Sequence, residues 1–171
     1  MNKFHMRQSI NDLQNVQRFS GVFQISDDST DFGRQFNIKG KRMTVAFHAL
    51  VNYDGMEPVD IPGAFLSAIP GITNLPVTDI AKMLDMSKSS FYRAKEEDKL
   101  EMDTVDKISS LMKIYRKGLE AFEGDKNDFY DWLDTRIASL GDVKPAELLK
   151  TETGRLSVLN AIDRIEQNVY G

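Results

Sequence analysis

Between residues 87 and 95 the sequence concentrates side chains that can bind a nucleic acid. Serine hydroxyls form hydrogen bonds with base edges or phosphates, and an arginine can bind guanine or a phosphate through two parallel hydrogen bonds. Lysines add positive charge. The candidate DNA contacts are Ser87, Lys88, Ser89, Ser90, Tyr92, Arg93 and Lys95, and we expect Ser89, Ser90 and Arg93 to be the main ones.

A purely structural role for some of these side chains is the alternative. Ser87 and Ser90 could serve only as helix caps, and Arg93 could pair with an acidic side chain at Glu96 or Glu97. The acidic run at residues 96–98 would repel DNA, so we expect it to point away from a bound duplex.

The elements that would position these side chains form a helix-turn-helix pattern over residues 77–96. The pattern needs a small residue where the two helices approach, and Ala81 stands there. Its packing positions are apolar, at Ile80, Leu84, Met86, Phe91 and Ala94. The turn usually holds glycine in the left-handed region, where this chain has Asp85. The second helix of such a unit enters the major groove.

Helical signals continue on both sides of this unit. We expect a helix over residues 60–69 that ends at Pro70 and Gly71, because proline cannot continue the helical hydrogen bonds. Further helices are expected after Pro76, where proline suits a first turn, and after Ser87, whose hydroxyl is a good N-cap.

A long amphipathic helix is expected to open at Asp103 or Thr104 and to end before Gly124. Its apolar residues recur at intervals of three and four: Val105, Ile108, Leu111, Met112, Tyr115, Leu119 and Phe122.

Short helices are expected after Asp125 and at Pro145, followed by a final helix capped by Thr151. The charged residues of the final helix, such as Arg155, are expected to lie mostly outside its apolar stripe. The stripe consists of Leu156, Leu159, Ile162 and Ile165. Trp132 is expected to be a core residue beside Phe129.

The N-terminal region reads differently, since polar runs separate short apolar patches without a helical period. Its best candidate element is residues 43–53, which could be a strand or a short helix. We therefore expect an all-α fold with three parts: a loosely structured N-terminal extension at 1–58, a helix-turn-helix DNA-binding domain at 59–124, and a small helical domain at 125–171.

Composition narrows the function classes. The chain has 171 residues, no cysteine and a net charge of −4, which argues against general coating of nucleic acid by phosphate neutralisation. The absence of cysteine, of a signal peptide and of a long apolar run favours the cytoplasm and no membrane association. His5 and His48 form no spaced ligand cluster, so no metal is expected. No phosphate loop, nucleophile elbow or metalloprotease motif occurs, so we expect neither enzymatic activity nor a cofactor.

Ordered sequence blocks over residues 60–171 resemble the Xre/MbcA/ParS antitoxins, the partners of RES-domain toxins. The blocks are Ser-Phe-Tyr-Arg-Ala-Lys after the turn, Ala121-Phe-Glu-Gly124, Phe129-Tyr-Asp-Trp-Leu133, Ala138-Ser-Leu-Gly141, Lys144-Pro-Ala-Glu-Leu-Leu149, Thr151-Glu-Thr-Gly154 and Ile162-Asp-Arg-Ile-Glu166. The chain departs from the family's pattern at two usual glycines, where it has Asp142 and Asn168.

The resemblance implies two partners, operator DNA and a cognate RES-domain toxin, with autorepression by a homodimer in a larger complex. It also implies that the C-terminal domain covers the toxin's NAD-handling active site, with contacts from Arg164, Asn168, Val169, Tyr170 and Gly171. The six basic and nine acidic residues of segment 125–171 suit a basic partner surface. Two alternatives stay open: a stand-alone transcriptional regulator whose C-terminal domain only oligomerises, and a toxin-binding protein whose helix-turn-helix is only a scaffold.

Overall fold

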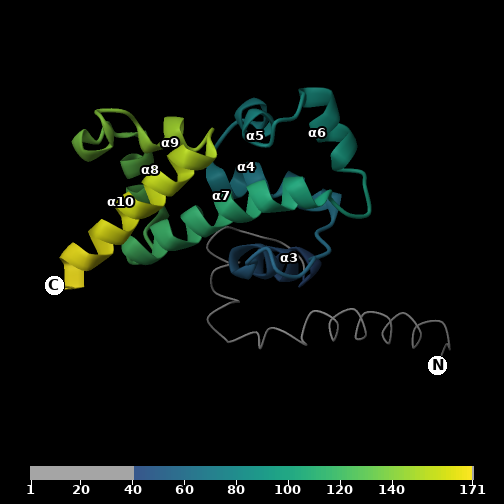
Figure 1. Ribbon diagram of the computed structural model, residues 1–171, viewed down its shortest axis with the longest axis horizontal. Helices are drawn as coiled ribbons and strands as arrows, with labels where there is room; N and C mark the ends of the chain where they lie inside the picture. Colours follow the sequence, from purple (N-terminus) through teal and green to yellow (C-terminus); the bar gives the residue numbers. More distant parts are fainter. Residues whose placement is uncertain (1–40, 171) are drawn as a thin grey trace.

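The computed structural model describes residues 41–170, except for the side chains of residues 41, 42, 44 and 168–170 (Figure 1). Its elements are α3 (Lys41–Asn52), the 3-10 helix η1 (Gly63–Ser67), α4 (Ile69–Thr73), α5 (Val77–Met83), α6 (Lys88–Ala94), α7 (Met102–Ala121), α8 (Lys126–Asp134), the 3-10 helix η2 (Ala138–Leu140), α9 (Pro145–Leu148) and α10 (Glu152–Tyr170). Across this range the only β-type pairing is an isolated bridge between Ile137 and Val143. The expected all-α class is confirmed.

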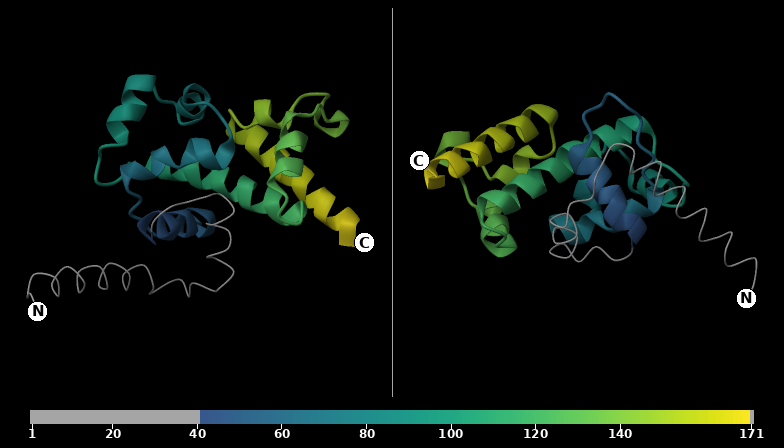
Figure 2. Two further views of the ribbon diagram at one scale, coloured as in Figure 1. Left: turned by 180° about the vertical axis from the view of Figure 1, so that it is seen from behind. Right: turned by 90° about the horizontal axis from the view of Figure 1, so that it is seen from below.

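Helix α7 is the central element, and α3 and α10 make the most extensive contacts with it (Figures 1 and 2). They use different faces of α7: Ser109 donates a hydrogen bond to the Leu50 carbonyl of α3 at 2.7 Å, whereas Ser110 accepts one from Arg155 of α10 at 3.2 Å. Every apolar position expected on the inner face of α7 is buried except Phe122, which is half-buried. One long helix therefore supports both the N-terminal and the C-terminal elements.

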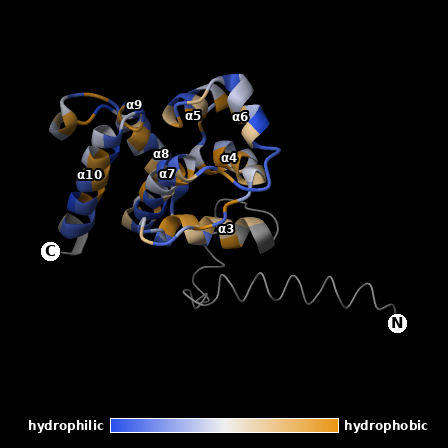
Figure 3. Ribbon diagram, turned by 45° about the vertical axis from the view of Figure 1, so that its right-hand side comes forward, coloured by the Kyte–Doolittle hydropathy of each residue, from blue (hydrophilic) through white to orange (hydrophobic). Residues whose placement is uncertain are grey.

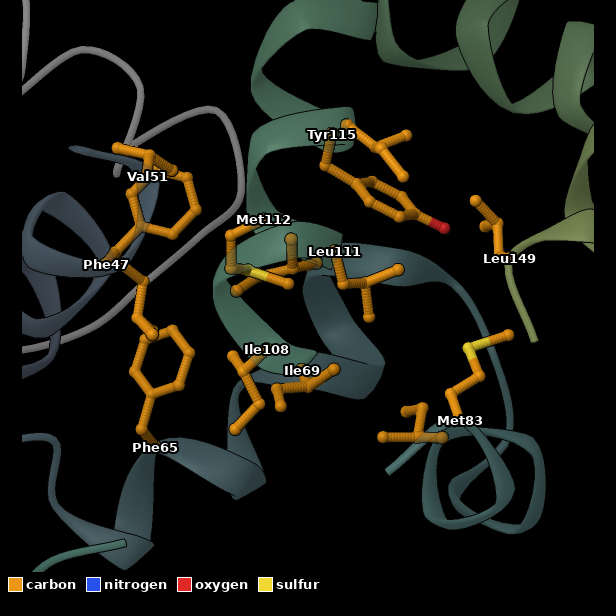
Figure 4. Close-up of a cluster of buried hydrophobic side chains, with 14 of the residues drawn as sticks. Phe47, Val51, Phe65, Ile69, Met83, Ile108, Leu111, Met112, Tyr115 and Leu149 are labelled. Carbon is orange, nitrogen blue, oxygen red and sulfur yellow. The ribbon is translucent and has the colours of Figure 1, made fainter. Parts of the chain in front are cut away.

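A continuous hydrophobic core joins these elements (Figure 4). In the close-up, Phe47 and Val51 of α3 lie on one side of α7, while Met83 of α5 and Leu149 lie toward the other. The core extends through Phe129 into the C-terminal segment, so packing does not break at the expected boundary between residues 124 and 125. The division into three parts stays a prediction.

Residues 41–52 correct the expectation of a loosely structured segment at 1–58. They form α3, with Phe47 and Leu50 fully buried, and this also decides between strand and helix for residues 43–53. The chain then turns through Asp54 and Gly55, where Gly55 has a φ of 84°. Residues 1–40 lie outside the described part of the chain.

The helix expected over residues 60–69 is wrong in its extent. A 3-10 helix occupies Gly63–Ser67, and α4 begins at Ile69, so that Pro70 lies in its first turn instead of ending a helix. Proline is accommodated there because the first-turn N–H groups have no partner within the helix. Asn74, with a φ of 55°, ends α4 in the left-handed conformation.

The apolar stripe of the final helix is also corrected. Leu156 is 58% exposed, whereas Arg155 is only 6% exposed, so α10 is rotated relative to the expected face. Val158 and Ile162 supply its fully buried positions, and Leu159 and Ile165 are half-buried. Between residues 163 and 167, α10 carries mostly hydrophilic residues (Figure 3).

Candidate functional sites

Helices α5 and α6 are joined by a short turn and pack on each other through the apolar residues expected for this purpose. Ile80, Leu84 and Phe91 are buried, and Ala81 is 2% exposed where the turn folds back. The Met86 N–H donates to the Ala81 carbonyl at 2.8 Å. Both helices therefore lie where the sequence pattern requires them, and a small residue occupies the close approach.

Asp85 adopts the left-handed conformation in this turn, with a φ of 55°. Its carboxylate also pairs with Lys107 of α7, at 3.0 Å between Oδ2 and Nζ. Lys107 binds Asp103 at 2.7 Å as well, and hydrogen bonds to Asp103 and then to Asp85 raise the pKa of this lysine. The residue that replaces glycine in the turn thus makes a tertiary contact that glycine could not make.

The N-terminus of α6 carries a network of serine hydroxyls. Ser87 caps the helix by accepting a hydrogen bond from the Ser90 N–H at 3.0 Å, as expected. The Ser87 hydroxyl also lies 2.9 Å from those of Ser89 and Ser90. These contacts order the first turn of α6 and hold three hydroxyls together at its exposed end.

Most of the predicted DNA contacts lie on the surface. Ser87, Lys88, Ser89, Tyr92 and Arg93 are exposed, while Ser90 and Lys95 are half-buried. The Lys95 ammonium lies 5.4 Å from the centre of the Tyr92 ring, a cation–π contact. The structure thus brings the predicted residues onto one short helix.

The alternative partners expected for Arg93 do not engage it, since no ion pair joins Arg93 to Glu96 or Glu97 within residues 41–170. The acidic run follows the C-terminus of α6, at the opposite end from the serine network. Backbone contacts fix it there, because Gly63 donates its N–H to the Glu97 carbonyl at 3.1 Å.

The C-terminal region is organised around an aromatic cluster. Asp125 caps α8 by accepting hydrogen bonds from the backbone N–H groups of the next turn. Phe129 of α8 is fully buried, stacks on Trp132 at 6.2 Å between ring centroids, and meets Tyr115 of α7 edge-on at 5.5 Å. Trp132 is half-buried and packs against the core, as expected.

Helix α10 lies across α7 through polar contacts that the sequence pattern did not indicate. Arg155 donates to the Leu149 carbonyl at 3.0 Å and to Ser110 of α7. Burial lowers the pKa of Arg155, and the negative charges of Glu152 and then Asp85 partly oppose this. Further along, Lys117 of α7 pairs with Asp163. Nothing in the sequence indicated that Arg155, a basic residue beside the apolar stripe, would be buried.

The predicted toxin contacts fall at the end of α10. Arg164 is exposed, the backbone at Asn168, Val169 and Tyr170 is helical, and the side chains of these three residues lie outside the described part of the structure, as does Gly171. Leu156 is a large exposed apolar side chain on the same helix that the sequence reasoning missed, having placed it in the core.

Within residues 41–170 no group of acidic residues and histidines is arranged to hold a metal ion. In the same range no helix is both long and apolar enough to cross a bilayer.

Comparisons with known proteins show similarity to antitoxins. Residues 118–167 match the antitoxin Xre/MbcA/ParS C-terminal toxin-binding domain. Antitoxin Xre of Yersinia enterocolitica is 29% identical over 98 residues, which are 57% of this chain and 66% of that protein. Antitoxin Xre of Photorhabdus laumondii subsp. laumondii is 27% identical over 110 residues, which are 64% of this chain and 74% of that protein. The chain is therefore similar to the Xre/MbcA/ParS antitoxins, and residues 118–167 carry the match to their toxin-binding domain.

Proposed function

We propose that this chain is the antitoxin of a type II toxin–antitoxin system, that it neutralises a RES-domain toxin through its C-terminal region, and that it represses its own operon through α6. The observation that carries the proposal is the match of residues 118–167 to a toxin-binding domain. The chain acts by occupying surfaces, without enzymatic chemistry or a cofactor, as a homodimer in the cytoplasm.

The toxin contact is proposed to run along the exposed side of α10 and through residues 168–171. Leu156 and Arg164 lie on this side, two turns apart, and Asn168, Val169, Tyr170 and Gly171 continue the chain beyond them. The tyrosine ring at this end suits a cleft built for a dinucleotide, which it would block by occupancy.

Growth rescue tests this contact. Coexpression of the full chain with the RES-domain toxin encoded beside it restores growth, and deletion of residues 168–171 weakens the rescue. Leu156→Ser also weakens it, because an exposed leucine at an interface loses its apolar contact. Met56→Ser is the matched control, since Met56 is 85% exposed and lies outside residues 118–167. Equal protection by the truncated and full-length proteins would refute the tail mechanism.

The operator contact is supported by the exposed first turn of α6. Its hydroxyls and cations face solvent, and no carboxylate in the described range neutralises Arg93. A net negative chain can bind DNA in this way because a few groups at one helix end meet the base edges and phosphates. A dimer would present two such helices about 34 Å apart, which predicts a palindromic operator.

A mobility shift assay with the promoter of the chain's own gene tests this contact. Arg93→Ala lowers the specific affinity about tenfold or more, because a bidentate contact to a base contributes roughly 1–3 kcal/mol. Lys99→Ala is the control, since Lys99 is an exposed cation beyond the acidic run. If wild-type protein forms no salt-sensitive, sequence-specific complex, α6 is a scaffold. If it binds DNA but no toxin, the chain is a stand-alone regulator.

A further inference from the structure

The turn between α5 and α6 is held by a side chain of α7. Asp85 in this turn pairs with Lys107 of α7, which Asp103 also binds from one turn away. The Lys107 side chain is 21% exposed and its ammonium binds both carboxylates, which are themselves 77% and 79% exposed. We call Asp85, Asp103 and Lys107 the polar junction.

Arg155 connects this junction to α10. Its guanidinium donates to Ser110, which lies three residues after Lys107 and therefore on the same side of α7. It also binds the Leu149 carbonyl just before α10. Arg155 thus fixes α10 to the side of α7 from which Lys107 holds the α5–α6 turn.

Helix α6 has few other anchors. It contains seven residues, of which only Phe91 is buried, and its C-terminal end meets η1 near Gly63. Its N-terminal end, which carries Ser89 and other candidate contacts, starts at the N-cap Ser87, two residues after Asp85. A tether on Asp85 therefore acts next to the end of α6 that must be placed accurately in a groove.

We propose that Lys107 is a positioning residue for operator binding, which holds α6 in its DNA-binding orientation through the Asp85 carboxylate. The inference rests on the proposed DNA-binding function and extends it to α7. It also assigns a role to aspartate at a turn position where glycine is usual: the carboxylate ties the turn to α7, while its backbone still takes the left-handed conformation.

Asp85→Gly tests the proposal directly, because glycine adopts a φ of 55° without strain and the substitution removes only the tether. Lys107→Met removes the other half of the pair and keeps most of the aliphatic stem. Lys99→Met is the matched control, since it removes an equal charge from a lysine that pairs with Asp60 on the surface.

The measurement is the fluorescence anisotropy of two labelled DNAs, the promoter fragment of the chain's own gene and a scrambled duplex, with thermal unfolding in parallel. Asp85→Gly and Lys107→Met each lower the specific affinity about twofold to fivefold, the range for a partly exposed ion pair, and leave binding to scrambled DNA unchanged. The double variant loses no more than either single variant.

Lys107→Arg keeps the ion pair and restores specific binding, a rescue that general loss of stability would not give. The proposal is overturned if the junction variants bind the promoter as tightly as wild type, or if Lys99→Met lowers the ratio of specific to non-specific affinity equally. In those cases the DNA-binding function stands. If wild-type protein does not distinguish the two DNAs, both that function and the role of the junction fail.

Discussion

Gly63 offers a sharp test of how α6 is held. A Cβ at this position would lie 2.7 Å from the Glu97 carbonyl oxygen and closer still to that of Ala94, whereas ordinary van der Waals contact begins at 3.4 Å. These are backbone atoms at the C-terminal end of α6, so no side chain can rotate away. In Gly63→Ala the end of α6 must therefore move away from η1, with loss of the Gly63 N–H bond to Glu97.

The expected cost is about 3 kcal/mol, at the upper end of the range for overpacking of a filled core. For a chain of this length that corresponds to a fall of roughly 6–12 °C in the melting temperature. Because the same movement displaces the candidate DNA contacts, the variant should also lose about tenfold or more of its specific DNA affinity, as one misplaced base contact contributes roughly 1–3 kcal/mol.

Gly71→Ala is the matched control. It makes the identical chemical change in α4, where an added Cβ meets nothing within 4 Å. Helix propensity makes it neutral or stabilising by up to ~1 kcal/mol. Differential scanning calorimetry and promoter binding measured on both variants decide the outcome. If the Gly63→Ala protein has the melting temperature of the wild type and binds its promoter with the same affinity, the close packing of η1 on α6 is refuted.

Three further substitutions probe other parts of the fold. Gly118→Ala drives a methyl group into the buried ring of Phe129. In urea denaturation the free energy of unfolding should fall by about 1–3 kcal/mol, and the fluorescence of the single tryptophan should change. Unaltered emission and stability would contradict this. Ser87→Ala removes the N-cap of α6 and should cost ~1 kcal/mol, whereas Ser87→Asp should retain stability. Tyr115→Phe removes the 2.9 Å hydrogen bond to the Thr73 carbonyl and should cost about 1–3 kcal/mol at neutral pH. Burial raises the pKa of Tyr115 above its ordinary value of 10.0. At alkaline pH unfolding therefore releases the phenol proton, and the wild type loses stability as the pH rises above about 10. Tyr115→Phe should lose less stability over that interval, and parallel pH profiles of the two proteins would contradict this.

Local signals in the sequence predicted much of the helical framework. The spacing of apolar residues in α7 and the capping residues Ser87, Asp125 and Thr151 each act within a few neighbouring residues, and the structure bears them out. The left-handed Asp85 was predictable for the same reason, because the conformation belongs to the turn itself. The resemblance that led to the antitoxin family likewise depended on the order of short blocks along the chain.

The failures lie where a short segment has several locally acceptable conformations. Residues 43–53 are apolar without a clear period, and their helical form in α3 follows from packing Phe47 and Leu50 against α7. Pro70 is acceptable either just after a helix or in its first turn. Only the structure placed it in the first turn of α4.

For the candidate sites, the sequence by itself determined which residues cluster on α6, because that cluster is contiguous in the chain. It did not determine the orientation of α10, where neighbouring positions differ by about 100° and a small rotation exchanges a buried residue for an exposed one. Tertiary structure buried Arg155 against Ser110 and left Leu156 in solvent. It also brought Lys107 to Asp85, a contact between helices that no local periodicity encodes, because only the packing of the α5–α6 pair on α7 creates it.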